Sequence, residues 1–304
     1  MAIGHSEYRK GFDMEIIKAI ILGFVQGVTE FLPISSSGHL SVFQHFFGTV
    51  GGNSSLLFTV LLHMGTLLAV FFVYYKTIWG LIVEAISLVK DIFTGKFKWS
   101  EMNENRRMLF MFVLSCLPLL LLLVPVGNDM KLMDVLGSLA DDNDIIVEGI
   151  CFLFTATLLL VGSWRAKNTE ARPQIGTKSA LAVGLAQAVA AGFPGISRSG
   201  STISSGMLCG VSKEYMVRYS FILGIPAIIA ANIMEIKDAV ELGEQVDILP
   251  VIVGVATAAI VGFAAIKALE WLVKIDKFKV FGYYCLALGV VVLGAGIAEK
   301  LGVF

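Results

Sequence analysis

Six long apolar stretches alternate with polar segments along the chain. Each is close to the length of about 20 residues that an α-helix needs to cross the hydrocarbon core of a membrane. The stretches cover residues 56–75, 108–126, 144–164, 215–236, 248–272 and 280–299. This pattern predicts an all-α membrane protein in which six transmembrane helices belong to one membrane domain, residues 1–304.

The composition agrees with that prediction. Hydrophobic residues make up 56% of the sequence and charged residues only 15%, whereas a soluble domain carries about 25% charged residues. The net charge of −1 and the lack of a basic stripe argue against a nucleic-acid partner. Residues 1–14 are polar and lack the apolar core of a signal peptide, so we expect a flexible extension there.

The polar segments between the spans alternate in charge. Segments 76–107, 165–178 and 274–279 are rich in lysine and arginine, whereas segments 127–144 and 237–247 are mainly acidic. Because loops rich in lysine and arginine stay in the cytoplasm, the three basic segments are predicted to lie inside and both chain ends outside. Residues 91–105 are amphipathic, and we expect them to lie at the cytoplasmic membrane surface.

Two further apolar regions, 15–48 and 178–211, are interrupted near their middle by proline, glycine and serine. Non-helical backbone at membrane depth is tolerated only where it is buried in protein or lines a wet cavity. We therefore expect each region to be a re-entrant helical hairpin. The alternative is that proline and glycine merely kink two helices.

The two interrupted regions resemble each other. ILGFVQGVTEFLPISSSG at 21–38 aligns with AVGLAQAVAAGFPGISRSG at 182–200 when one residue is inserted at Gly195. The predicted span after the first copy runs inward and the one after the second runs outward, so the copies are inverted. Inverted repeats place a site where two broken helices meet near the membrane midplane. We assign residues 15–140 to the first repeat and 141–304 to the second.

The chemistry of the two hairpin tips points to an anionic ligand. A helix that starts at a tip presents unpaired N–H groups and the positive end of its dipole, and serine caps such starts. Arg198 adds a planar cation that suits phosphate oxygens. Further hydroxyl donors are Ser35, Ser36, Ser37, Ser197, Ser199, Ser201 and Thr202. The expected ligand is a phosphate or diphosphate group.

Anion binding alone does not explain Glu30 and His39. A carboxylate beside a phosphate either moves a proton or holds a divalent cation, unless it only pairs with Arg198. His39 titrates near neutral pH and would serve as acid, base or nucleophile, unless it is a buried, hydrogen-bonded histidine. His5, His45 and His63 lack motif partners, and we interpret them as structural.

QGVTEFLPISSSGHL and PGISRSGST resemble the two signature motifs of the BacA-type undecaprenyl-diphosphatases, and the resemblance extends from about residue 15 to the end. It implies an inner-membrane enzyme that removes the terminal phosphate of undecaprenyl diphosphate. The product, undecaprenyl phosphate, is the lipid carrier for peptidoglycan and other wall polymers. The resemblance also implies bacitracin resistance, a divalent cation (Mg²⁺ or Ca²⁺) and a site open to the periplasm. A homodimer is left open.

The resemblance also implies roles for single residues. Catalytic roles fall on Glu30, Ser36, His39 and Arg198. Some members have a second glutamate where this chain has Gln26, so Glu30 would hold the cation alone with diphosphate oxygens. Substrate-binding roles fall on Gln26, Ser35, Ser37, Gly38, Gly195, Ser197, Ser199, Gly200 and Thr202. Ser36, our choice of nucleophile, competes with His39 and with a direct attack by water.

Two other functions compete with this one. Acid-phosphatase-like lipid phosphatases share a Ser-Gly-His and a later Ser-Arg, but they need a second histidine after the arginine. Here no histidine follows His63. A polyprenyl-phosphate transporter or flippase would use the same inverted, broken helices around an anion pocket. Release of phosphate from a long-chain prenyl diphosphate separates the enzyme from the transporter.

Overall fold

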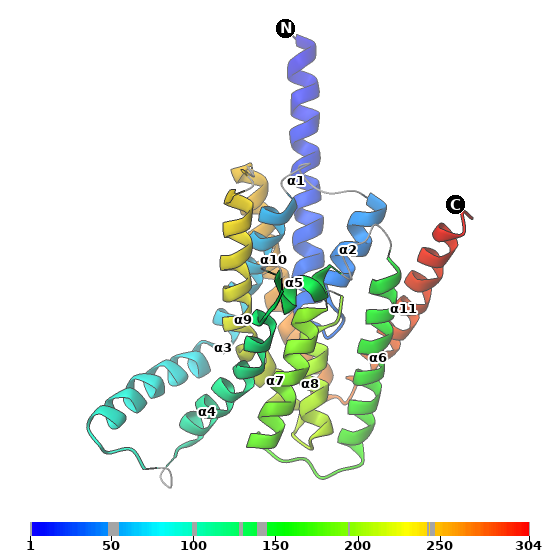
Figure 1. Ribbon diagram of the computed structural model, residues 1–304. Coiled ribbons are helices and arrows are strands. Elements are labelled where there is room, and N and C mark those ends of the chain that lie inside the picture. Colours follow the sequence, from blue (N-terminus) through cyan, green and yellow to red (C-terminus); the bar gives the residue numbers. More distant parts are fainter. Residues whose placement is uncertain are drawn as a thin grey trace.

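The computed structural model describes residues 2–47, 55–98, 102–127, 130–138, 145–193, 195–241, 243 and 247–303. Within these residues six helices are long and apolar enough to cross a membrane, which confirms the predicted number of spans. They cover Leu57–Phe93, Glu104–Leu123, Ile146–Lys167, Lys213–Glu241, Ile248–Lys274 and Lys279–Lys300. The described chain is mostly helical, as Figure 1 shows.

The elements follow one another as a series of helices with one small ribbon. The first part contains α1 (Ala2–Phe31), α2 (Ser36–Phe47), α3 (Ser55–Phe93), α4 (Glu104–Cys116), the 3₁₀ helix η3 (Leu117–Leu123), β1 (Pro125–Gly127), β2 (Met130–Lys131) and α5 (Leu132–Gly137). The second contains α6 (Ile146–Lys167), α7 (Thr177–Gly192), α8 (Arg198–Leu208), α9 (Lys213–Glu241), α10 (Ile248–Lys274) and α11 (Lys279–Lys300).

The N-terminal segment differs from the prediction. Helix α1 begins at Ala2, so residues 2–14 are helical instead of forming a flexible extension. No proline occurs in this segment, and a helix propagates easily into residues that do not break it. The start of α1 stands clear of the other helices (Figure 1).

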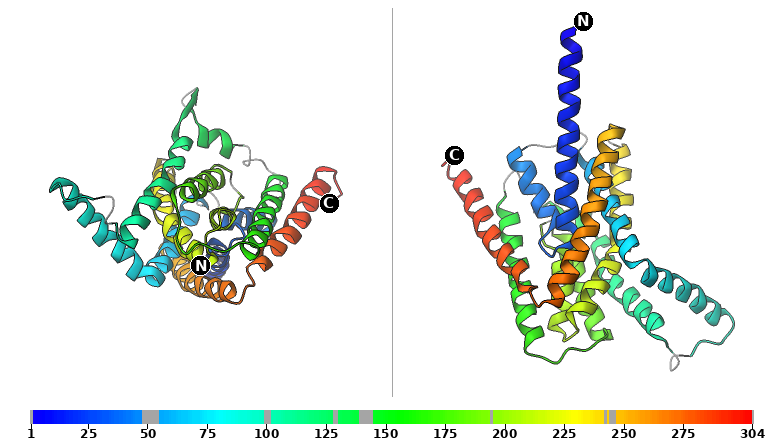
Figure 2. Two further views of the ribbon diagram at one scale, coloured as in Figure 1. Left: turned by 90° about the horizontal axis from the view of Figure 1, so that it is seen from below. Right: turned by 180° about the vertical axis from the view of Figure 1, so that it is seen from behind.

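Helix α3 is also longer than its predicted span. It has 39 residues and bends at Tyr74, whose φ of −109° and ψ of 21° are not helical. At 1.5 Å per residue it measures about 58 Å, nearly twice the hydrocarbon thickness of about 30 Å. Beyond the bend it pairs with α4, and the two project sideways from the bundle (Figure 2). Arg106 on α4 joins them through ion pairs with Glu84 and Asp91 of α3.

The span predicted at 108–126 consists of two helix types. Helix α4 ends at Cys116, and η3 continues the span to Leu123 with Pro118 near its start. Proline lacks the N–H that an α-helix would use there. The polar segment beyond contains the antiparallel pair β1–β2 and the short helix α5, which are small departures from an all-α prediction.

Each interrupted region is a helix, a break and a second helix. Helix α1 ends at Phe31 and α2 starts at Ser36, whereas α7 ends at Gly192 and α8 starts at Arg198. Pro33 lies in the first break, and Pro194 lies outside the described residues.

Helix α8 is a polar helix in the interior of the bundle. Most of its residues are buried, although it carries four serines and a threonine. It packs against α6, α7 and α9, and apolar side chains such as Ile203 and Met207 belong to the main core cluster. The surrounding helices therefore hold the start of α8 firmly at the centre of the protein.

Candidate active site

Both breaks are closed by the same capping interaction. The Ser35 hydroxyl accepts a hydrogen bond from the backbone N–H of Gly38 (3.1 Å), and the Ser197 hydroxyl accepts one from Gly200 (3.0 Å). Each serine thus satisfies one of the first N–H groups of the helix that follows it. The Ser-x-x-Gly spacing of the two motifs explains where α2 and α8 begin.

The two breaks touch each other. The backbone N–H of Gly195 donates to the Ser37 hydroxyl (3.2 Å), and the Ser199 hydroxyl donates to the carbonyl of Leu32 (3.4 Å). Gly195 has a φ of 104°, which favours glycine. Two helix N-termini from distant parts of the sequence therefore meet, and each contributes partial positive charge to the same place.

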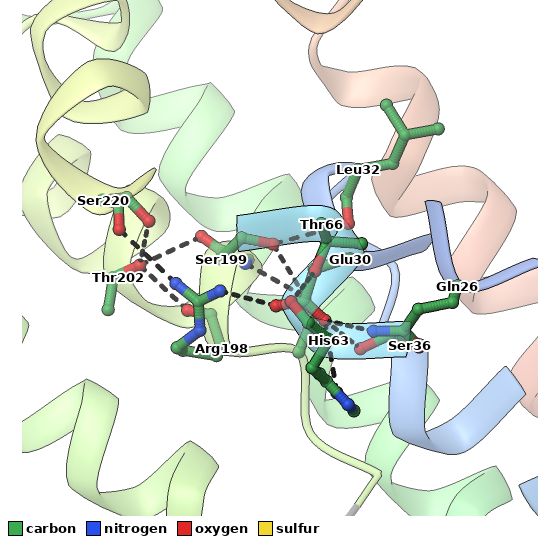
Figure 3. A network of polar contacts seen from close by, with 12 residues as sticks. Gln26, Glu30, Leu32, Ser36, His63, Thr66, Arg198, Ser199, Thr202 and Ser220 are labelled. Carbon is green, nitrogen blue, oxygen red and sulfur yellow. Dashed lines mark hydrogen bonds and ion pairs between the residues drawn. The ribbon is translucent and has the colours of Figure 1, made fainter. Parts of the chain in front are cut away.

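Glu30 lies in the last turn of α1. It is the centre of the polar network at this meeting point (Figure 3). Its Oε1 accepts from Nη2 of Arg198 at 2.8 Å, and its Oε2 accepts from the Ser36 hydroxyl at 2.7 Å. The Gln26 side-chain amide donates to the same Oε2 at 3.2 Å. A serine hydroxyl, a carboxylate and a guanidinium are thus assembled from α1, α2 and α8.

Arg198 reaches Glu30 across the face of α9. Its Nη1 makes only a long hydrogen bond to the Ser220 carbonyl (3.4 Å). A Cβ atom added at Gly224 would lie 2.7 Å from Cζ of Arg198 and closer still to Nη1. The missing side chain at Gly224 therefore creates the space that the guanidinium occupies, and one edge of the guanidinium remains weakly bonded and suited to an anion.

His63 belongs to this network, which corrects its interpretation as a merely structural histidine. It lies on α3, and its Nε2 is 3.8 Å from Oε2 of Glu30. Its Nδ1 is 2.9 Å from the Thr59 carbonyl, which can only accept, so Nδ1 carries the hydrogen. No motif surrounds His63 in the sequence, because only the packing of α3 beside α1 brings it to Glu30.

These residues line a cavity of about 220 Å³. Of the predicted site residues, it contains Glu30, Ser35, Ser36, Ser37, Ser197, Arg198 and Ser199. The opposite wall comes from α9 and includes Asn232 and Glu235, which sequence reasoning missed. Both sit in an apolar span, and an intramembrane acid or amide is the signal that could have found them.

The other predicted residues do not line the cavity. Gly38, Gly195 and Gly200 shape the two breaks, and Gln26 is fully buried behind Glu30. The Thr202 hydroxyl is bonded to Ser220 (2.6 Å) inside the protein. The three glycines and Thr202 therefore act on the site through the backbone or through a neighbour, whereas the Gln26 amide contacts Glu30 directly.

His39 does not line the cavity that contains Glu30, Ser36 and Arg198. Its Nδ1 lies 2.6 Å from the Ser35 carbonyl, and its Nε2 lies 2.8 Å from the Tyr284 hydroxyl on α11. Its ring stacks on Tyr284 and meets the edge of Phe152. His39 is therefore half-buried and hydrogen-bonded through both ring nitrogens; a catalytic role for it stays a prediction.

Few oxygen atoms are placed to hold a cation. Among the described residues no three His, Cys, Asp or Glu side chains form a metal-binding group. However, Oε1 of Gln26 is buried without a hydrogen-bond partner, and its amide is bonded to Glu30. One carboxylate and one amide oxygen fit a hard cation such as Mg²⁺, which takes only one or two carboxylates when a phosphate supplies further ligands.

The arrangement suits transfer of a phosphoryl group. A serine hydroxyl that donates to a carboxylate is the geometry of an activated nucleophile. The two helix N-termini and the Arg198 guanidinium would neutralise a highly charged anion in the interior of the membrane domain. No such positive assembly would be needed for a neutral substrate.

Comparison with known proteins agrees with this chemistry. A family model described as bacitracin resistance protein BacA matches residues 19–291. An undecaprenyl-diphosphatase of Alkaliphilus metalliredigens is 39% identical over 285 residues, which cover 92% of this chain and 98% of that protein. An undecaprenyl-diphosphatase of Methanosphaera stadtmanae is 36% identical, and the match covers 92% of this chain and 98% of that protein. One of Desulforapulum autotrophicum is 34% identical, and the match covers 93% of this chain and 99% of that protein.

Proposed function

This chain belongs to the bacitracin resistance protein BacA family, and on that premise we propose that it hydrolyses undecaprenyl diphosphate to undecaprenyl phosphate and inorganic phosphate. The observation that carries the proposal is the contact of Ser36 and Arg198 with the two oxygens of Glu30 at the meeting of two helix N-termini. The reaction regenerates the lipid carrier for wall polymers, which connects the enzyme with bacitracin resistance.

Arg198 and the two helix N-termini bind the diphosphate. As the substrate enters, its oxygens compete with Glu30 for the guanidinium, whose Nη1 edge has only the long bond to Ser220. Bidentate contacts of arginine with phosphate oxygens are strong and directional. The charge that develops on the transferred phosphoryl group is then matched by donors that are already in position.

Ser36 attacks the terminal phosphorus. The Ser36 hydroxyl passes its proton to Oε2 of Glu30, 2.7 Å away, while its oxygen forms the new bond to phosphorus. The bond from phosphorus to the bridging oxygen breaks, and undecaprenyl phosphate leaves. The protonated Glu30 gives this proton to the departing undecaprenyl phosphate and is a carboxylate again. Glu30 then takes a proton from the water that attacks the phosphoserine, the bond from phosphorus to the Ser36 oxygen breaks, and inorganic phosphate is released while the serine regains a proton from Glu30. His39 is not the nucleophile in this scheme because it is bonded to Tyr284.

A divalent cation is the proposed cofactor. Glu30 and Oε1 of Gln26 would hold it, and substrate oxygens and water would complete its ligands. The cation supplies positive charge that polarises the phosphoryl oxygens.

We assign the two helix pairs, α1–α2 and α7–α8, to re-entrant hairpins of an inverted repeat. The equivalent serine caps at Ser35 and Ser197 support this assignment. The charge alternation of the loops supports a site that opens to the periplasm. An undecaprenyl diphosphate head group released on that side would reach the cavity without crossing the membrane.

Purified protein in detergent with undecaprenyl diphosphate and Mg²⁺ provides the test. Released inorganic phosphate and a trapped phosphoserine at Ser36 are expected, and Ser36→Ala should abolish both while keeping the fold. If wild-type protein releases no phosphate yet moves a prenyl phosphate across vesicles, the transporter alternative replaces the enzyme. If Ser36→Ala retains full turnover, water attacks directly and the Ser36 nucleophile is wrong.

A further inference from the structure

A second cavity lies beside α9, away from the candidate active site. Its volume is about 390 Å³, and its walls come from the segment at Pro173, the start of α9 and the last turns of α10. The active-site cavity touches α9 from Ala227 onward, whereas this one touches it no further than Arg218. Nine residues of helix correspond to about 13 Å along the axis, so the two are distinct sites.

Two cations, Arg218 and Lys274, line this cavity. Within the part of the chain that the structure describes, neither Arg218 nor Lys274 forms an ion pair. The Arg218 guanidinium lies 5.6 Å over the ring of Tyr215. Stacking of this kind uses the face of the guanidinium and leaves its N–H edges for an acceptor.

The acids in the cavity do not cancel this charge. Glu270 accepts hydrogen bonds from Lys267 (3.0 Å) and from the Tyr74 hydroxyl (2.9 Å), so its charge is already compensated. Glu214 is the remaining acid in the lining. The two cations outnumber it, and the positive end of the 29-residue helix α9 adds to them.

Lysines also lie around the turn that follows Lys274. The pKa of Asp276, in the turn between α10 and α11, is lowered by a hydrogen bond from Lys213 and by the charges of Lys167 and Lys279. Three lysines therefore lie close enough to this turn to act on the Asp276 carboxyl. By the positive-inside rule this is the cytoplasmic end of the helices, where the inner leaflet also attracts basic segments.

The wall of the cavity is a fixed part of the fold. Arg172 donates its backbone N–H to Gly210 (2.8 Å) and accepts at its carbonyl from Ser212 (2.9 Å), just before Pro173. The Arg172 guanidinium also donates to the Cys209 carbonyl and to Ser179. The Pro173 side of the pocket is thus formed before a ligand arrives, which lowers the cost of ordering it on binding. Arg218 and Lys274 are exposed and accessible to a ligand from solvent or from the membrane surface.

We propose that this cavity binds a phosphate group through Arg218 and Lys274, carried by an anionic lipid head group of the cytoplasmic leaflet or by free phosphate. Arginine and lysine are the usual phosphate ligands, and basic pockets between transmembrane helices on the cytoplasmic side bind anionic lipid head groups. The site lies outside the catalytic network and does not depend on the proposed hydrolysis.

Binding is measured on the full-length protein in a neutral detergent by native mass spectrometry and by the shift in thermal unfolding temperature. The probes are phosphatidylglycerol, zwitterionic phosphatidylcholine and inorganic phosphate. Arg218→Gln and Lys274→Gln should each weaken binding of the phosphate probe by about tenfold or more, the usual value of a charge-assisted hydrogen bond. Arg218→Lys, which keeps the charge, should lose less. The control is Lys237→Gln, because Lys237 is a 73% exposed lysine on the same helix.

The outcomes distinguish a lipid head group from free phosphate, and binding in this cavity from binding in the active site. Binding of phosphatidylglycerol but not of inorganic phosphate identifies a lipid head group, and binding of both identifies a general phosphate site. Equal effects of phosphatidylglycerol and phosphatidylcholine, or binding that survives in Arg218→Gln and Lys274→Gln, overturns the proposal. If only Arg198→Ala abolishes binding, the probe binds at the active site, and this result also overturns the proposal of a second phosphate site. Hydrolysis should stay at the wild-type rate in Lys274→Gln.

Discussion

A methyl group at position 224 should disable Arg198 without touching a charged residue. Gly224 lies in α9, and a Cβ atom there would lie 2.7 Å from Cζ of Arg198, whereas ordinary contacts begin at 3.4 Å. In Gly224→Ala the guanidinium must retreat by about 1 Å. Its 2.8 Å bond to Glu30 would then lengthen beyond hydrogen-bonding range.

The size of the effect follows from the role of the arginine. Arginines that stabilise phosphoryl transfer contribute about 10³–10⁵ in rate, and a displacement of about 1 Å costs about 10²-fold. Gly224→Ala should therefore lower kcat/KM about 10²-fold, less than Arg198→Ala. The helix itself should gain stability, because alanine is favoured over glycine by about 1 kcal/mol in a helix interior.

Phosphate release and thermal unfolding are measured together on the purified variants. Gly294→Ala on α11 is the matched control, because a Cβ atom there meets nothing within 4 Å, and its turnover should not change. In an Arg198→Ala background, Gly224→Ala should cause no further loss, since the group that it displaces is gone. Wild-type turnover in Gly224→Ala, or a full further loss in the double variant, would refute the reasoning.

Four further predictions concern other parts of the molecule. Arg198→Lys keeps the charge but not the planar fork, so it should fold and lose at least about 10² in turnover; wild-type activity would mean that charge alone matters. Tyr284→Phe removes the hydroxyl partner of His39 and should lower turnover by less than tenfold with an unchanged pH profile, whereas a shifted profile would return His39 to acid–base catalysis. A cysteine at Asp238 should react with an impermeant reagent from outside and one at Lys96 should not; the reverse pattern would overturn the orientation. Asp276→Asn tolerates the φ of 56° and should lower stability at pH 7 by less than about 1 kcal/mol because the aspartate is exposed. Since Lys213 lowers the pKa of Asp276, the difference from wild type should shrink as the pH falls below about 4 and vanish once the pH is below that lowered pKa; a difference that stays constant through this range would exclude the ion pair as its cause.

The sequence by itself determined the membrane class, the six spans and the two breaks. Each of these depends on local patterns: apolar runs of about 20 residues, and serine and glycine at fixed spacing around a proline. The same patterns identified Glu30, Ser36 and Arg198, because ionisable and hydroxyl residues in an apolar environment are costly without a function.

Only the tertiary structure decided which side chains meet. His63 of α3 lies 3.8 Å from Glu30, and Asn232 of α9 lines the same cavity. Both positions depend on how separate helices pack, a relation that no local pattern carries. Packing also turned His39 toward Tyr284, 245 positions away. Gly224 is one of 31 glycines, and its importance arises because the guanidinium of Arg198 occupies the space that any larger side chain would fill.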